Sequence, residues 1–134
     1  MTRAPILALF LLFSPPALAD ACRWREPPRT YPGGLAWNCA AIRWADGDTL
    51  TVRCAGQPAL IRVRLRGVDT VERGHPRWRA ARLQLRRRTE AAPLVILPHH
   101  GSHNRVVATV LANGRDVGRA MDAAGWSKRD CPRR

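Results

Sequence analysis

The sequence predicts a mainly β domain with helices (α+β), in which five strands form a small closed or nearly closed barrel with two or three helices packed on it. Three features predict this class. Apolar and polar residues alternate with period two between residues 38 and 66. Apolar residues recur at helical spacing in 76–90 and 117–124. The pair Asn113-Gly114, which is typical of a tight hairpin turn, follows a later apolar run.

The chain before residue 38 is predicted to lie outside this domain. Residues 1–19 have the features of a signal peptide: Arg3, a short apolar core from Ile6 to Phe13, and a small-residue cleavage site. This core is too short to span a bilayer. Residues 20–37 are rich in proline and glycine and predict an irregular segment. We therefore expect an exported protein, periplasmic or secreted, whose folded domain covers 38–134.

The first three strands are predicted within the first half of this domain. Residues 40–44 and 50–54 alternate across a turn at Asp46-Gly47, which indicates a hairpin with an acidic tip. The next strand has the clearest alternation in the chain, and its arginine-bearing face leads toward the acids that follow it. The apolar face carries Ile61, Val63 and Leu65, and the basic face carries Arg62, Arg64 and Arg66.

A helix is predicted over 76–90, because Pro76 suits a first turn and apolar residues follow at helical spacing. Arginines repeat the same spacing on another face. Two interpretations of that stripe remain open: a solvated surface, and a rim for phosphate groups. The apolar set is Trp78, Ala81 and Leu85, and the stripe is Arg79, Arg82 and Arg86.

Two short strands, 94–97 and 105–111, and a helix over 117–124 that stops at Gly125 complete the order. Three strands, a helix, two strands and a helix fit the five-stranded oligonucleotide-binding (OB-fold) barrel. The chain after the signal peptide contains no phenylalanine, so tryptophans must supply the aromatic bulk of the core and barrel ends. These are Trp37, Trp44, Trp78 and Trp126.

Four cysteines in an exported chain predict two disulfide bonds, because their spacing does not match the close pairs of zinc sites. Four cysteines allow three pairings. Position near the two ends favours Cys22 with Cys131, and position beside the hairpin favours Cys39 with Cys54. Export disfavours the alternative of free buried thiols. A lipoprotein signal ending at Cys22 is a poor match, because Asp20 lies in the lipobox.

The formal net charge of +13 predicts a polyanionic partner, such as nucleic acid or an anionic membrane surface. Lys128 is the only lysine, so the basic charge is almost entirely arginine. A solvated arginine-rich surface is the alternative interpretation. No basic helix has a broad apolar face, so stable membrane insertion is not expected. The sequence indicates no protein partner, and we expect a monomer.

Four of the ten acidic residues lie in two short motifs, Asp46-Gly47-Asp48-Thr49 and Asp69-Thr70-Val71-Glu72. In so basic a chain, close pairs of carboxylates indicate a bound cation. Oxygen ligands without sulfur or paired imidazole favour calcium or magnesium. Asp48 and Asp69 fall at the ends of neighbouring predicted strands, so both are expected at one mouth of the barrel.

Joined to Arg64, the two motifs resemble the staphylococcal nuclease (thermonuclease) family. In that family a D-G-D-T turn is followed by R-L-x-G-[IV]-D-T-P-E and later by a strand that begins Y-G-R. The resemblance covers about residues 40–127. It implies an OB-fold barrel and a calcium-dependent endonuclease that hydrolyses DNA and/or RNA with low sequence specificity and leaves 3′-phosphate ends.

The resemblance also implies a role for each matching acidic residue. Asp48, Asp69 and the carbonyl oxygen of Thr70 would bind Ca²⁺, with Asp46 close to the bound ion. Glu72 would be the general base that orients and deprotonates the attacking water.

Arg64 and Arg105 would, by the same resemblance, hold the scissile phosphate and stabilise the charge that builds on its oxygens. Fixed guanidinium groups and a divalent cation are also what hydrolysis of an anionic phosphodiester requires on chemical grounds. Two positions depart from the family pattern. Val71 stands in place of a proline, and His103-Asn104 precede Arg105 in place of Tyr-Gly.

Three histidines, His99, His100 and His103, leave two interpretations open. One is a transition-metal site. The other is a polar loop at the barrel mouth that touches substrate or solvent. The loop is favoured because a transition-metal site of this kind needs a cluster of histidines earlier in the chain, and only His75 precedes these three.

The alternative function is a catalytically weak or inactive OB-fold protein that only binds nucleic acid. The acidic motifs favour the enzyme, because a pure binding module gains nothing from carboxylates beside a phosphate.

Overall fold

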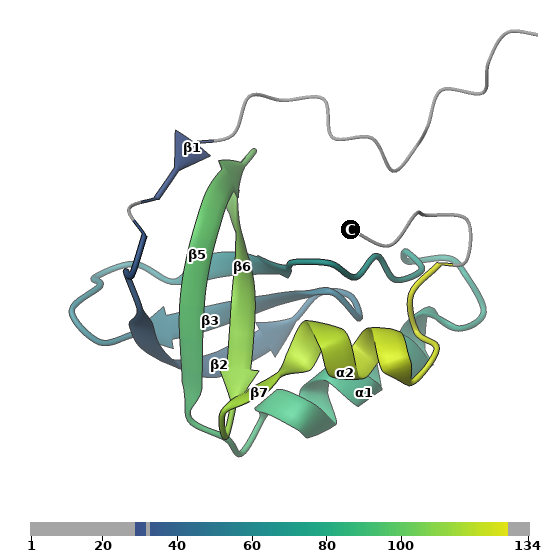
Figure 1. Ribbon diagram of the computed structural model, residues 1–134. Helices are drawn as coiled ribbons and strands as arrows, with labels where there is room; N and C mark the ends of the chain where they lie inside the picture. Colours follow the sequence, from purple (N-terminus) through teal and green to yellow (C-terminus); the bar gives the residue numbers. More distant parts are fainter. Residues whose placement is uncertain (1–28, 32, 129–134) are drawn as a thin grey trace, which may run out of the picture.

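The computed structural model describes residues 29–31 and 33–128 (Figure 1). Strands and helices follow one another in an order close to the predicted one, with two short strands added. The elements are β1 Arg29–Thr30, β2 Trp37–Trp44, β3 Thr49–Cys54, β4 Ile61–Leu65, α1 Trp78–Thr89, β5 Leu94–Ser102, β6 Arg105–Ala112, β7 Arg115–Asp116 and α2 Val117–Ala123.

Five of the strands close into a barrel. The strand order is β1-β5-β2-β3-β4-β6-β7, and an additional pairing between β5 and β6 joins the two sides. All of these pairs are antiparallel except β4 with β6, which is parallel and has α1 in its crossover. The prediction of a mainly β domain with helices around a closed ring of five strands is confirmed. The finer assignment to the OB-fold stays a prediction.

The period-two pattern of the strands explains how the barrel is filled. In β4, Val63 and Leu65 are fully buried, whereas Arg62 and, directly after the strand, Arg66 are exposed. Apolar residues of β3, β5 and β6 complete the core, and Leu85 of α1 and Met121 of α2 cover it. The two helices lie next to each other on one side of the barrel (Figure 1). Trp37, Trp44 and Trp126 are partly buried against this core, as expected.

Strand β5 differs from its prediction. It extends to Ser102, so His99 and His100 lie in a strand and the predicted polar loop at these residues is wrong. The register of β5 on β6 shifts between Pro98 and His100, which is how a proline is tolerated inside this strand. His103 begins the two-residue turn into β6 and has a φ of 52°, a left-handed conformation that such turns require.

Two further boundaries differ. Strand β1 and the start of β2 at Trp37 fall in the segment that the sequence predicted to be irregular. Helix α1 begins at Trp78, two residues after Pro76. The predicted signal peptide lies outside the described residues. Within the described part of the chain, no helix is both long enough and apolar enough to cross a membrane.

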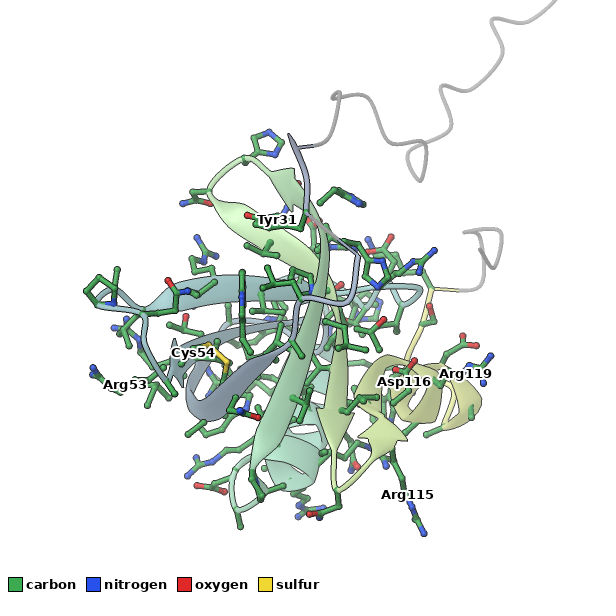
Figure 2. All side chains as sticks on the ribbon, turned by 60° about the vertical axis from the view of Figure 1, so that its left-hand side comes forward. Tyr31, Arg53, Cys54, Arg115, Asp116 and Arg119 are labelled. Carbon is green, nitrogen blue, oxygen red and sulfur yellow. A yellow bond between two sulfur atoms is a disulfide. The ribbon has the colours of Figure 1, made fainter. Side chains whose placement is uncertain are left out.

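A disulfide bond joins Cys39 of β2 to Cys54 of β3, as predicted. The two residues lie directly opposite each other in the register of the hairpin, at the end away from the acidic tip. Figure 2 shows Cys54 turned toward this bond, while the neighbouring side chain of Arg53 points outward. The predicted partners Cys22 and Cys131 lie outside the described residues.

The disulfide generates a stability prediction. Its partners are 15 residues apart in the sequence, and closing a loop of this size stabilises a protein by about 3 kcal/mol through the unfolded state. The double variant Cys39→Ala/Cys54→Ala should therefore lose roughly that free energy of unfolding in urea. Adding a reductant to both proteins should remove most of the difference. A difference that reductant leaves unchanged would contradict the assignment of this effect to the bond.

Candidate functional site

The carboxylate of Asp48 is buried at the start of β3. Its Oδ1 accepts a hydrogen bond from Oγ1 of Thr49 at 2.9 Å, and its Oδ2 accepts one from the backbone N–H of Thr70 at 2.9 Å. Its backbone oxygen accepts from the N–H of Leu65 at 2.8 Å. Burial raises the pKa of Asp48, and the charge of Arg64 and these hydrogen bonds oppose part of the rise.

Arg64 of β4 connects the two acidic motifs. Its Nη2 lies 2.9 Å from Oδ1 of Asp69 and 3.5 Å from Oδ2 of Asp48. The alternation of β4 directs Val63 and Leu65 into the core and leaves Arg64 on the other face. The two predicted motifs therefore meet at one guanidinium group, which is what their placement at the ends of neighbouring strands predicts.

The tip between β2 and β3 packs tightly on helix α1. A Cβ atom at Gly47 would lie 2.8 Å from the Cβ of Ala81 and 2.9 Å from Oγ1 of Thr70. Beside it, Nε1 of Trp78 donates a hydrogen bond to Oδ1 of Asp46 at 2.6 Å. The helix thus holds the acidic tip in place, and glycine is required because no side chain fits.

Ser127 and Lys128, at the end of the described chain, hold Asp69 in place. The sequence did not predict these contacts. Oγ of Ser127 accepts a hydrogen bond from the N–H of Asp69 at 3.1 Å. The N–H of Lys128 donates to the backbone oxygen of Asp69 at 2.7 Å, and its Nζ lies 3.8 Å from Oδ2 of that residue. Ser127 and Lys128 follow the last helix without any periodic pattern, so no sequence signal identified them.

Arg105, at the start of β6, is a partly buried cation beside these groups. Burial lowers its pKa, the charge of Arg64 lowers it further, and Asp48 and Asp46 act in the opposite direction. Arg105 becomes a neighbour of Arg64, although the two are distant in sequence, because β6 pairs in parallel with β4. Within residues 29–31 and 33–128, the guanidinium of Arg105 forms no hydrogen bond or ion pair. Such a group is suited to bind an anion.

Glu72 lies two residues beyond Thr70 in an exposed segment. Its backbone oxygen accepts from the N–H of His75 at 3.1 Å in a turn. Its carboxylate makes no hydrogen bond or ion pair with the part of the chain that the structure describes. The structure therefore brings Asp48, Thr70, Asp69, Arg64 and Arg105 together, and it leaves the side chain of Glu72 without a fixed partner there.

Asp48 and Asp69 offer the hard oxygen atoms that calcium prefers. Both carboxylates already converge on one cationic point, Nη2 of Arg64, so the pair fits a small cation at that position. Among the described residues, no group of three or more His, Cys, Asp or Glu side chains is placed to hold a metal ion. Calcium would thus take its remaining ligands from backbone oxygen and water, which is common for this ion.

The histidines of β5 form a different environment. Nη1 of Arg66 lies 3.3 Å from Nδ1 of His99, and Nε2 of His99 lies 2.9 Å from Oγ1 of Thr109. Both nitrogens of this ring are therefore close to protein groups, and one of these groups is a cation. These contacts disfavour a transition metal at His99, because a metal would need one of these nitrogens free of a neighbouring positive charge.

No family model matches the chain, and a search of curated proteins finds no match.

The close packing at Gly47 predicts a loss of stability on substitution. Gly47→Ala places a methyl group against Ala81 and Thr70, and overpacking of this kind costs about 1–3 kcal/mol. Thermal and urea unfolding would measure it. Gly33→Ala is the matched control, because nothing lies within 4 Å of a Cβ there. Equal stability of the two variants would show that the tip does not rest on α1.

The β5 histidines predict a loss of stability in acid. Burial lowers the pKa of His99 and of His100, and the charge of Arg66 lowers both further. As the pH falls through 6.5, the ordinary pKa of histidine, these histidines take up protons in the unfolded chain but stay neutral in the folded protein. The free energy of unfolding should therefore decrease as the pH is lowered, until the lower pKa values of the folded protein are reached.

Urea unfolding at several pH values between 7 and 5 tests this expectation. His99→Gln should reduce the pH dependence, and Arg66→Gln should reduce it too by raising the pKa of both histidines. A His99→Gln variant with the same pH dependence as the wild type would contradict the assignment.

Proposed function

We propose that the protein is a calcium-dependent endonuclease that hydrolyses phosphodiester bonds of DNA and/or RNA with low sequence specificity and leaves 3′-phosphate ends. One observation carries this proposal: Asp48 and Asp69 converge on Arg64, and beside them lies the guanidinium of Arg105, which has no hydrogen bond or ion pair with the described residues. A metal-assisted site for phosphodiester hydrolysis needs carboxylates that bind the metal ion and, next to them, a cationic side chain that binds the phosphate.

In this proposal, Asp48, Asp69 and the carbonyl oxygen of Thr70 would hold calcium, which would supply positive charge beside the phosphate and activate water. If calcium neutralised these carboxylates, the guanidinium of Arg64 would be available to the substrate. Arg64 and Arg105 then bind the phosphate oxygens and stabilise the extra negative charge of the transition state.

Glu72 takes the proton of the attacking water in this scheme. The water oxygen bonds to phosphorus, the bond from phosphorus to the 5′-oxygen breaks, and the 5′-oxygen leaves with a proton from solvent. Exposure of the Glu72 carboxylate allows it to meet a water at the edge of the site.

We also propose that the protein is exported and that its barrel is an OB-fold. The disulfide bond between Cys39 and Cys54 supports export, because such bonds persist in oxidising compartments. The closed five-stranded barrel with one parallel pair supports the OB-fold.

A second candidate function is nucleic-acid binding without cleavage. One observation favours it: Glu72 has no fixed partner in the described part of the chain, and a general base that is not held in place is a weak one. The two candidate functions differ in that the nuclease requires calcium and Glu72 for cleavage, whereas the binding protein requires neither.

A cleavage assay on plasmid DNA and on RNA separates them. The oxidised protein should cut with calcium and stop with chelator. Glu72→Gln and Arg105→Gln should each lower kcat by about 10²-fold or more. Arg115→Gln is the matched control for Arg105→Gln, since Arg115 is exposed and does not belong to the candidate site.

Absence of cleavage above the chelator control, together with a Glu72→Gln variant equal to the wild type, would reject the nuclease. Binding that persists in chelator and weakens steeply with salt would then support the second candidate.

A further inference from the structure

Arginines lie over tryptophan rings around helix α1. The guanidinium carbons of Arg73 and Arg82 are 5.0 and 5.1 Å from the ring centroid of Trp78. That of Arg86 is 5.2 Å from the centroid of Trp44. These distances are within the range of cation–π attraction, which limits where each guanidinium group lies.

The two tryptophan rings are themselves fixed. Nε1 of Trp78 donates to Asp46 at the acidic tip, and Nε1 of Trp44 donates to Oγ1 of Thr89 at 2.8 Å, near the end of α1. Trp78 begins α1 and its ring is hydrogen-bonded to the tip, whereas the ring of Trp44 is hydrogen-bonded to the last residue of α1, so the two rings mark the two ends of the helix. The arginines above them therefore form a row that starts at the candidate site.

The row carries charge that the described residues do not neutralise. Arg73, Arg79 and Arg82 are exposed, and none of them has an ion pair within the described part of the chain. Only Arg86 has one, with Glu90 at 2.6 Å. Two like charges at the single ring of Trp78 repel each other. A bound anion would relieve this repulsion.

Helix geometry gives the row a regular spacing. Arg79, Arg82 and Arg86 recur three and four residues apart, so they lie along one flank of α1 and rise about 4.5–6 Å at each step. A chain of phosphates presents charges at regular intervals, whereas a single small anion would contact only one of these positions. The guanidinium groups also lie over the indole faces, which leaves those faces less accessible to bases.

We propose that this arginine–tryptophan strip, made of Arg73, Arg79, Arg82 and Arg86 with Trp44 and Trp78, binds the phosphate backbone of nucleic acid next to the candidate site. The strip recognises charge and not base identity. The inference rests on the proposed function for its substrate class, and it adds a subsite that extends beyond the bond to be cleaved.

Binding without catalysis tests the strip. Fluorescence anisotropy of labelled oligothymidine of 4 and 16 nucleotides would be measured with the full oxidised chain in chelator at several salt concentrations. The strip variant is Arg73→Gln/Arg79→Gln/Arg82→Gln. The control variant Arg53→Gln/Arg115→Gln/Arg119→Gln removes the same charge from residues that lie elsewhere on the molecule (Figure 2).

The strip variant should bind the 16-mer at least about tenfold more weakly than the control variant does at 0.1 M salt. The slope of log K against log salt should fall by about 2, since each lost phosphate contact to a single strand contributes about 0.7. The 4-mer should show a smaller loss, because it does not span the row. Circular dichroism and thermal unfolding would establish that both variants are folded.

Equal weakening by the two triple variants would overturn the proposal, because net charge alone would then explain binding. So would a strip variant that binds oligonucleotides normally and loses only binding to anionic lipid vesicles. If the strip variant fails to fold, Arg73→Gln/Arg79→Gln replaces it, because it leaves Arg82 on the ring of Trp78, and it should still bind the 16-mer more weakly than Arg53→Gln/Arg115→Gln. A protein that binds in this way but never cleaves would fail the nuclease proposal and leave the strip in place.

Discussion

The buried carboxylate of Asp48 is the interaction on which the rest of the site depends. Taking a carboxylate out of water is costly unless donors replace the lost solvent. Here the hydroxyl of Thr49, the N–H of Thr70 and the guanidinium of Arg64 point at it. These donors belong to β3, to the segment after β4 and to β4 itself. Satisfying one charge therefore fixes how three parts of the chain meet.

This arrangement separates two kinds of arginine. Arg64 faces two carboxylates, so its charge is largely matched within the protein. Arg105 and most of the arginine–tryptophan strip are not matched in the described part of the chain. Unmatched charge attracts anions from a distance and is screened by salt. In the proposed function, the acids determine where on this basic protein a bound cation would lie beside an anion.

Much of the fold could be predicted, because the strongest periodic patterns coincide with the barrel. The alternation in 61–65 defines β4, and Asn113-Gly114 does form the turn between β6 and β7. The extension of β5 through its histidines could not be predicted. A bulge at Pro98 shifts the register there, and a proline in the middle of a strand ordinarily argues against one.

The meeting of Asp48, Asp69 and Arg64 could also be predicted, since ends of neighbouring strands lie together. The contacts of Ser127 and Lys128 with Asp69 could not be predicted. Ser127 is 58 residues from Asp69 in the sequence and lies in a segment without periodicity. The catalytic and metal-binding roles of these residues stay predictions that depend on the resemblance and on chemistry.

Closure of the barrel through the pairing of β5 with β6 has a consequence for how copies of the protein behave toward each other. Each of the five barrel strands has a neighbour on both sides, and the strands that end the order, β1 and β7, contain two residues each. Unpaired strand edges are templates for intermolecular sheets. A sheet whose edges are limited to these two short strands offers little template of this kind to a second copy of the protein.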